Sequence, residues 1–277
     1  MTDNDLSHPQ CTAYLDRPGG RIAYEVGGDG PLVVLVPGMG DLRATYRFLA
    51  PTVRAAGYRV ASTDLRGHGD SDATFASYGD AETAGDIAAL IGELGGPAVV
   101  VGNSMGAGAA ALAAAQQPEL VSGLVLIGPF VRQPQVGAAS RLLLRVAMAR
   151  PWVARVWGAY LPKLYPGRRP ADFDQYRAEI VASLRRPGHA RAFSRTTRTS
   201  HAPVEARLGD VRAPALVVMG ALDPDFKDPQ AEAGWIARAL RAEVVIVPEA
   251  GHYPQAQRPD VTTEAVLGFL GNVVDRA

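Results

Sequence analysis

The sequence is short of cysteine and of net charge. Cys11 is the only cysteine among 277 residues, and 28 Lys and Arg residues balance 28 Asp and Glu residues. A single thiol cannot form a disulfide within the chain, so a reducing compartment is allowed. Balanced charge provides no general attraction to nucleic acid or to an acidic partner, and we expect no nucleic-acid partner.

The sequence also lacks a stretch that we interpret as a secretion signal or a membrane span. Its first ten residues are polar and acidic, without the basic and apolar segments of a signal peptide. The longest stretch almost free of charge, residues 97–117, contains glycines, Asn103 and Ser104, which fit a buried strand and helix better than a span. We expect a cytoplasmic protein without stable membrane insertion, in which residues 1–20 form a tail.

Patterns typical of metal and nucleotide sites are missing too. The sequence has no His-x-x-x-His spacing, no cysteine pair and no acidic calcium loop. No phosphate-loop or dinucleotide signature follows a predicted strand. We therefore expect no metal and no cofactor.

What the sequence does contain is a strand, a sharp turn and a helix around Ser104. An apolar run at residues 98–101 ends in Gly-Asn-Ser-Met-Gly at residues 102–106, and an alanine-rich stretch follows. The two glycines make room for a strained turn that holds the serine Oγ clear of the backbone. The Met105 N–H, near the positive end of the helix, can point at a developing oxyanion. The pattern predicts a nucleophile; a glycine-rich turn with a surface serine is the alternative.

Strand and helix patterns alternate along most of the chain. Apolar, β-branched runs predict strands at residues 32–36, 58–63, 98–101, 121–127, 215–219 and 244–247. The alternation predicts right-handed crossovers and a mainly parallel sheet with helices on both faces. Residues 21–26 alternate polar and apolar and predict a hairpin with residues 32–36. Residues 130–205 show helical patterns and no convincing strand.

This order of elements, with the Gly-x-Ser-x-Gly turn, resembles the α/β-hydrolase fold family from about Arg21 to the C-terminus. The resemblance implies an α/β core made of residues 21–129 and 206–277, and an inserted helical cap, or lid, of residues 130–205. It also implies that an acid and a histidine follow the serine, in the order Ser, Asp, His.

Asp223 and His252 match those two positions. Asp223 follows the penultimate predicted strand, which places its carboxylate at the same sheet edge as Ser104, and Asp225 and Asp228 are less favoured alternatives. His252 follows the last predicted strand, directly behind a glycine. Taken singly, the aspartate fits a turn before proline and the histidine fits a surface loop. The shared order favours catalysis.

A second glycine-rich loop, Pro-Gly-Met-Gly at residues 37–40, follows a buried strand. The resemblance assigns the second oxyanion N–H to Met39. Many family members carry His-Gly in place of this Pro-Gly pair, so any role of that histidine is absent here. His68 lies in a loop, residues 64–71, similar to the family's Asp-x-Arg-Gly-x-Gly-x-Ser loop; it precedes the serine, and we expect it to be structural.

These residues define a mechanism. A free hydroxyl is a poor nucleophile at neutral pH, so His252 would take the Ser104 proton and later deliver it to the leaving group. Asp223 would hold the imidazole tautomer and stabilise the imidazolium. The amides of Met39 and Met105 would bind the oxyanion, and water would clear an acyl-enzyme.

We expect a substrate pocket around this site. Its predicted lining residues are Gly38, Asn103, Phe130, Trp152, Trp157 and Tyr253.

The predicted cap is strongly basic. Residues 131–200 contain thirteen arginines and one lysine against three acidic residues. One interpretation is a solvated surface that pairs with an acidic body. The other is that some of the arginines attract an anionic substrate or a membrane surface, because apolar residues interleave with them; the candidates are Arg141, Arg145, Arg150 and Arg155.

We expect a serine hydrolase, carboxylesterase-like, acting on a small or medium apolar acyl ester. The Gly-Asn-Ser-Met-Gly turn also resembles that of the meta-cleavage-product hydrolases, which break carbon–carbon bonds, although the predicted oxyanion loop at residues 37–40 differs from the longer glycine-rich loop of that subfamily. C–C hydrolysis is therefore the alternative, and its ketone substrate would be anionic. A ligand receptor on the same fold is a third possibility. The oligomeric state is left open.

Overall fold

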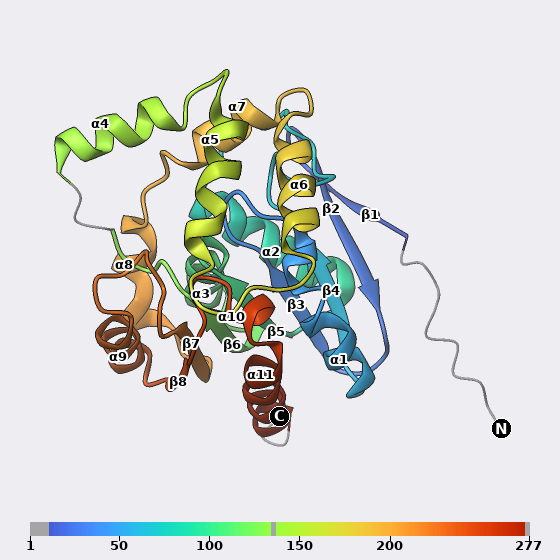
Figure 1. Ribbon diagram of the computed structural model, residues 1–277. Helices are drawn as coiled ribbons and strands as arrows, with labels where there is room; N and C mark the ends of the chain where they lie inside the picture. The colour runs from blue at the N-terminus through green and yellow to red at the C-terminus, as the bar shows by residue number, and fades with distance from the viewer. Residues whose placement is uncertain (1–10, 134–136, 275–277) are drawn as a thin grey trace.

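The computed structural model describes residues 11–133 and 137–274, and these form one twisted sheet flanked by helices (Figure 1). The eight strands run in the order β1-β2-β4-β3-β5-β6-β7-β8. From β4 to β8 all neighbouring strands are parallel. The strands are β1 Ala13–Arg17, β2 Gly20–Gly27, β3 Leu32–Val36, β4 Arg59–Thr63, β5 Ala98–Asn103, β6 Val121–Ile127, β7 Ala215–Gly220 and β8 Glu243–Val247.

The predicted hairpin between residues 21–26 and 32–36 is wrong. Strand β2 pairs antiparallel with β1 and β4 instead. Strand β3 is buried at every position and lies between the parallel strands β4 and β5. A strand apolar on both faces belongs in the middle of a parallel sheet, so β3 leaves no edge for β2.

Helices cover both faces of the sheet, and the strands alternate their side chains between them. Val34 and Val36 pack into one core with α2 (Asp80–Leu94), α3 (Met105–Gln116) and α9 (Pro229–Leu240). Val33 and Leu35 face a second core with α1 (Leu49–Ala55) and α11 (Pro259–Val274). This two-faced burial confirms the predicted mainly parallel sheet with helices on both faces.

A long insertion between β6 and β7 is helical. It comprises α4 Ala138–Ala147, α5 Val153–Tyr160, η2 Leu161–Leu164, α6 Phe173–Leu184, α7 His189–Thr196, α8 Ala202–Arg207 and η3 Leu208–Asp210. Helices α5 to α7 lie over the carboxyl edge of the sheet and share an apolar core with Tyr253 of the body, whereas α4 extends away from the rest of the protein (Figure 1). The remaining short elements are η1 Arg43–Tyr46 and α10 Pro254–Gln257.

Within this insertion, residue 133 and residues 200–201 meet at a neck. The Gln133 side-chain oxygen accepts hydrogen bonds from the Ser200 hydroxyl at 3.1 Å and from the His201 N–H at 2.9 Å. Helix α8, which follows, packs against α3 and α2 of the body. The division into a tail, a core and a cap of residues 130–205 stays a prediction.

The N-terminal prediction needs one correction. Strand β1 lies within residues 1–20, which were expected to form a tail, and it pairs with β2 through residues 13–17. Residues 1–10 lie outside the described residues. In the described ranges, no helix combines the length and the apolar character that a membrane crossing needs.

Candidate active site

Ser104 stands on a strained turn between β5 and α3. Its φ of 56° and ψ of −123° place it in a region that non-glycine residues rarely adopt. A Cβ at Gly102 would lie 2.5 Å from the Gly106 oxygen, and a Cβ at Gly106 would lie 2.4 Å from the Pro37 oxygen. Both glycines are therefore needed for the strand, helix and loop to approach each other.

Asn103 braces this turn. Its side chain is fully buried, and its amide donates to the Ile127 carbonyl at 3.1 Å and to the His252 carbonyl at 3.2 Å. It thereby joins the Ser104 turn to the loop that carries the histidine. We predicted Asn103 as a pocket residue; the structure gives it these two bracing bonds.

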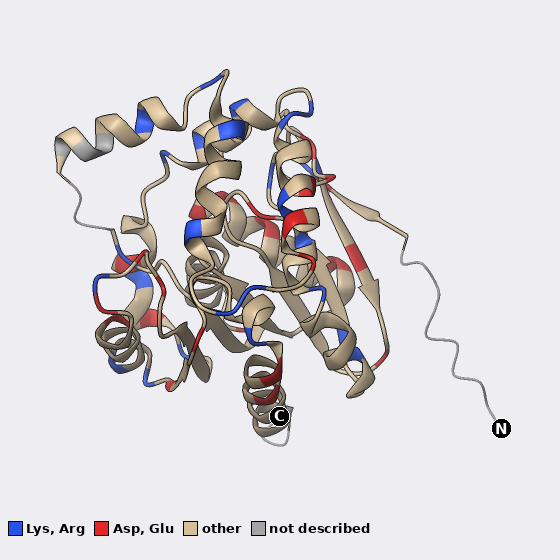
Figure 2. Ribbon diagram, viewed as in Figure 1, with Lys and Arg blue, Asp and Glu red and all other residues tan. Residues whose placement is uncertain are grey.

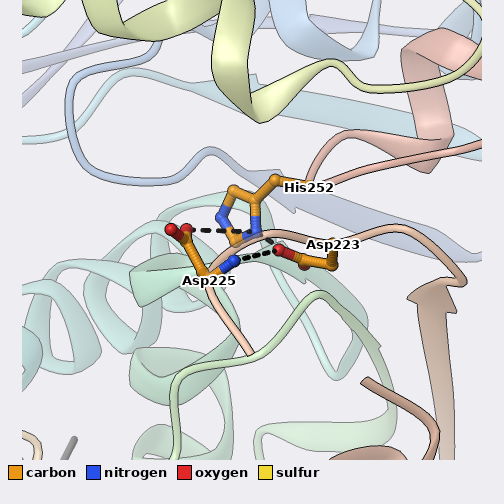
Figure 3. A group of neighbouring side chains, drawn as sticks. All are labelled: Asp223, Asp225 and His252. Atoms are coloured by element: carbon orange, nitrogen blue, oxygen red, sulfur yellow. Dashed lines mark hydrogen bonds and ion pairs between the residues drawn. The ribbon is translucent and has the colours of Figure 1, made fainter. Parts of the chain in front are cut away.

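Asp223 and His252 form a buried pair (Figure 3). The His252 Nδ1 lies 2.8 Å from the Asp223 Oδ2, and the second Asp223 oxygen accepts the Asp225 N–H at 3.0 Å. Burial lowers the pKa of His252, but the nearby carboxylates of Asp223 and Asp225 outweigh it and raise the pKa to about 9. The pair therefore stabilises an imidazolium.

A further carboxylate and a tyrosine border this pair. The Asp225 Oδ2 lies 3.6 Å from the His252 Nδ1, and the hydroxyl of Tyr160 on α5 lies 3.3 Å from the Asp225 Oδ1. Burial raises the pKa of Asp225, and burial together with Asp225 raises the pKa of Tyr160 to about 12. Tyr160 gave no signal in the sequence, because its contact joins segments 65 residues apart.

Three candidate metal ligands lie together here, because one atom from each of Asp223, Asp225 and His252 lies within 4.8 Å of the others. The His252 Nδ1, however, already bonds to Asp223. A hydrogen-bonded acid–base pair accounts for the cluster, and we assign no metal to it.

The loop at residues 37–40 lies against Ser104. A Cβ built on Gly38 would come 2.8 Å from the Ser104 Cβ. The Gly40 N–H donates to the His68 Nε2 at 3.0 Å, and the Gly40 oxygen accepts the indole N–H of Trp157 at 2.8 Å. Met39 lies between these fixed points. Its N–H and that of Met105, which begins α3, stay predicted oxyanion donors.

His68 has the structural role that the sequence indicated. Its Nδ1 bonds to the Arg66 carbonyl at 2.9 Å, while its Nε2 accepts from Gly40, so the ring is neutral with its proton on Nδ1. Burial lowers the pKa of His68 to about 4, which keeps this tautomer at neutral pH.

The insertion also holds the loop of His252. The His252 N–H donates to the Leu164 carbonyl at 2.9 Å. A Cβ on Gly251 would lie 2.3 Å from the Pro166 Cδ, so the glycine before the histidine is required for this close approach. The candidate site is therefore assembled from the body and the insertion together.

Of the other predicted pocket residues, three lie near this assembly. Phe130 contacts the His252 ring edge-on at a centroid distance of 5.9 Å, and Tyr253, next to His252, stacks on Tyr165. Trp157 is buried at the Gly40 loop. Trp152 is corrected: its side chain is 46% exposed and its indole N–H bonds to the Val146 carbonyl, so it lies on the surface of the insertion.

A separate groove of about 630 Å³ lies between α6, η1 and β4, and Ser104 does not line it. Charged side chains that pair with one another line this groove. Arg43 pairs with Glu25 at 2.8 Å, with Asp70 at 2.9 Å and with the fully buried Asp64. The loop at residues 64–71, which contains Asp64, therefore has a structural role beneath the insertion.

Comparison with known proteins agrees with this architecture. The chain is 30% identical to 2-(acetamidomethylene)succinate hydrolase of Mesorhizobium japonicum, over 91% of this chain and 92% of that protein. It is 28% identical to 2-hydroxy-6-oxononadienedioate/2-hydroxy-6-oxononatrienedioate hydrolase of Comamonas testosteroni, over 91% and 92%. A crystal structure of a hydrolase from Pseudomonas aeruginosa matches with a TM-score of 0.78 and 25% identity, over 94% and 98%.

The profile of one sequence family spans most of the chain. It is described as the alpha/beta hydrolase family, and it matches residues 33–265. This range runs from β3 to α11 and contains Ser104, Asp223 and His252. The protein is a hydrolase, and its chain belongs to the alpha/beta hydrolase family.

Proposed function

We propose that this hydrolase cleaves a carboxylic ester through an acyl-enzyme on Ser104. The observation that carries the proposal is the buried 2.8 Å contact between Asp223 and His252, in a loop that Asn103 ties to the Ser104 turn. Strained serine, paired histidine and buried acid are the parts that nucleophilic acyl transfer needs.

The reaction proceeds in two halves. The Ser104 Oγ attacks the ester carbonyl while His252 takes its proton, and the carbonyl electron pair moves onto oxygen, where the N–H groups of Met39 and Met105 stabilise it. The tetrahedral intermediate collapses, the C–O bond of the ester breaks, and His252 protonates the departing alkoxide oxygen to give the alcohol. Water then repeats the attack on the acyl-enzyme and frees the acid and Ser104.

C–C bond hydrolysis is the second candidate. The relative from Comamonas testosteroni is named for a hydroxy-oxo diacid, and it shares 28% identity along nearly the whole chain. Both relatives described above are named for substrates that carry carboxylates. The arginines of the insertion suit an anionic substrate, which makes a carboxylate-bearing ester or ketone the preferred small molecule.

The test combines labelling with turnover. The protein is treated with a fluorophosphonate and its intact mass is measured, beside hydrolysis of short and medium p-nitrophenyl esters and of a vinylogous diketo acid. We expect stoichiometric labelling and ester turnover. Ser104→Ala should abolish both, whereas Ser77→Ala, which changes an exposed serine, should affect neither.

Each outcome separates the candidates. Diketo-acid turnover without ester turnover favours C–C hydrolysis, and labelling without any turnover contradicts both proposed substrate classes. Ester turnover of Ser104→Ala above about a thousandth of wild type points to another nucleophile. Absence of labelling contradicts the proposed site. Turnover of carboxylate-bearing esters that is no more salt-sensitive than that of neutral esters removes the role of the arginines.

A further inference from the structure

Helix α4 exposes apolar side chains to solvent. Leu142, Leu143, Leu144 and Val146 are 63%, 70%, 47% and 52% exposed, and Trp152, which bonds to the end of the helix, is 46% exposed. Figure 1 shows α4 extending away from the remaining helices. A group of exposed apolar side chains on one helix is a candidate interaction surface.

The charge around these side chains has one sign. Residues 120–171 contain no aspartate or glutamate. Arg145, Arg150 and Arg155 are exposed and form no ion pair within the described residues, and Figure 2 shows a basic position and no acidic one on the described part of α4. We call the five apolar residues and these three arginines the α4 patch.

We propose that the α4 patch docks on an anionic lipid surface. Leucine and tryptophan side chains of a helix lying in the interface enter the boundary between headgroups and acyl chains, while arginines bind the phosphates. A second copy of the chain is a poorer occupant, because a two-fold contact would set the patch against itself and arginine against arginine.

Vesicle binding tests this proposal without any turnover, so its result is independent of the proposed hydrolysis. The full chain is sedimented with vesicles of phosphatidylglycerol and phosphatidylcholine, and with vesicles of phosphatidylcholine alone. One double variant, Leu142→Ser with Leu143→Ser, removes apolar area. A second, Arg145→Gln with Arg150→Gln, removes charge.

Matched controls change exposed residues elsewhere. Val244→Ser replaces a 40% exposed apolar side chain on β8, and Arg185→Gln with Arg212→Gln removes two exposed arginines outside the patch. Sedimentation velocity without lipid monitors self-association, and circular dichroism checks the fold of every variant.

We expect salt-sensitive binding to the anionic vesicles, weakened at least about tenfold by either patch variant and unchanged in the controls. Failure to bind anionic vesicles overturns the proposal. So does equal binding to both lipid compositions, or binding that both patch variants retain. Self-association that the leucine variant abolishes, without lipid binding, identifies a second copy as the occupant instead.

A second inference, from a different observation, concerns Asp225. Figure 3 shows dashed lines joining the carboxylates of both Asp223 and Asp225 to the His252 ring, and the Asp225 Oδ2 lies 3.6 Å from the His252 Nδ1. The Asp225 N–H bonds to Asp223, and Tyr160 of α5 contacts the other Asp225 oxygen at 3.3 Å. Body and insertion thus fix the second carboxylate together.

We infer that Asp225 is a second acidic partner of His252 and that Tyr160 positions it, an inference that rests on the proposed role of His252. Its negative charge stabilises the imidazolium beside Asp223 and can replace part of that residue's role. The other titratable groups around His252 are Asp41, from the loop after β3, and the neighbouring Tyr253.

The pKa of His252, followed by NMR, and the pH profile of kcat/KM test this inference. Asp225→Asn removes a negative charge, so the pKa of His252 and the acid limb should move to lower pH. Tyr160→Phe should move them in the same direction, but less. Asp228→Asn removes a charge from the same loop, where that side chain caps α9, and should leave both unchanged.

A double variant measures the replacement. Asp223→Asn should keep about tenfold more activity than Asp223→Asn with Asp225→Asn. Equal activity of these two, or an unmoved His252 pKa in Asp225→Asn, overturns the inference. Because NMR reads His252 without turnover, a protein that fails to hydrolyse esters still reports on Asp225.

Discussion

The indole N–H of Trp157 donates to the carbonyl oxygen of Gly40 at 2.8 Å, and this bond ties α5 of the insertion to the loop beside Ser104. On its other side the same glycine donates its N–H to His68 of the body at 3.0 Å. Because Met39 precedes this doubly held residue, the orientation of its N–H depends on both halves of the protein.

Trp157→Phe should therefore lower kcat while KM changes little. The variant keeps an aromatic ring in the core but loses one hydrogen bond, worth about 1 kcal/mol, which corresponds to about a fivefold lower kcat. Steady-state kinetics with a p-nitrophenyl ester measure it. Trp152→Phe removes the comparable bond to Val146 and is the control. Equal effects of the two substitutions would contradict a role of the Gly40 bond.

His68→Gln should make folding stability less sensitive to acid. Burial holds the pKa of His68 at about 4 in the folded state, below its ordinary 6.5, so the unfolded state binds more protons between these values. Neutral His68 therefore contributes about 3 kcal/mol to the free energy of unfolding above pH 6.5, and this contribution is lost as the pH falls toward 4. Glutamine can still accept from Gly40 and does not titrate.

Urea unfolding at pH 7.5 and 4.5 measures this effect. The difference in free energy of unfolding between wild type and His68→Gln should shift in favour of the variant at pH 4.5. A difference that is the same at both pH values would show that His68 is not the titrating group.

Gly38→Ala should disable the site without unfolding the protein. The new methyl would lie 2.8 Å from the Ser104 Cβ and must displace this proposed nucleophile, so we expect at least about a hundredfold loss of kcat/KM. Gly92→Ala is the matched control, because a Cβ there meets nothing within 4 Å on helix α2. That control should raise stability by about 0.5–1 kcal/mol and leave activity intact. Normal fluorophosphonate labelling of Gly38→Ala would be the contrary result.

Arg43→Met should destabilise the protein by about 3–5 kcal/mol in urea unfolding, because it strands the buried Asp64 without its cation. Arg21→Met breaks a more exposed pair with Asp72 and should cost less than about 1 kcal/mol. Adding Asp64→Asn to Arg43→Met should recover part of the loss. Equal losses for the two arginine variants would mean that the burial of Asp64 is unimportant.

The sequence was sufficient for the features that depend on local patterns. The glycines around Ser104 specify the turn, and the apolar runs before Asp223 and His252 specify two strands. Parallel strands end at one edge of a sheet, which is why residues so distant in sequence could be placed together before any coordinates. The contact between Asp223 and His252 agrees with that placement.

Other features depend on partners that no local pattern encodes. Strand β2 pairs with β4 rather than with its neighbour in sequence, because β3 is committed to parallel partners. Trp152 was placed in the pocket by residue type, yet the direction of its side chain puts it on the surface. Tyr160 reaches Asp225 only through the packing of α5.

The arginines of the insertion divide between the two interpretations. Arg186 pairs with Asp70 of the body, as a solvated basic surface would. Arg145 and Arg150 stay exposed beside apolar side chains. The number of arginines in the sequence cannot show which of them form ion pairs, because pairing depends on which face of each helix contacts the body.

The neck at Gln133 has a consequence for how proteins of this kind diversify. Because residues 133 and 200–201 are held together at the neck, a longer or shorter segment between them adds only the slowly growing entropic cost of closing a loop. The strands of the sheet can keep their positions when the length of that segment changes. The part of the insertion free to vary excludes Trp157, Tyr160 and Leu164, because their contacts with Gly40, Asp225 and His252 hold the candidate site.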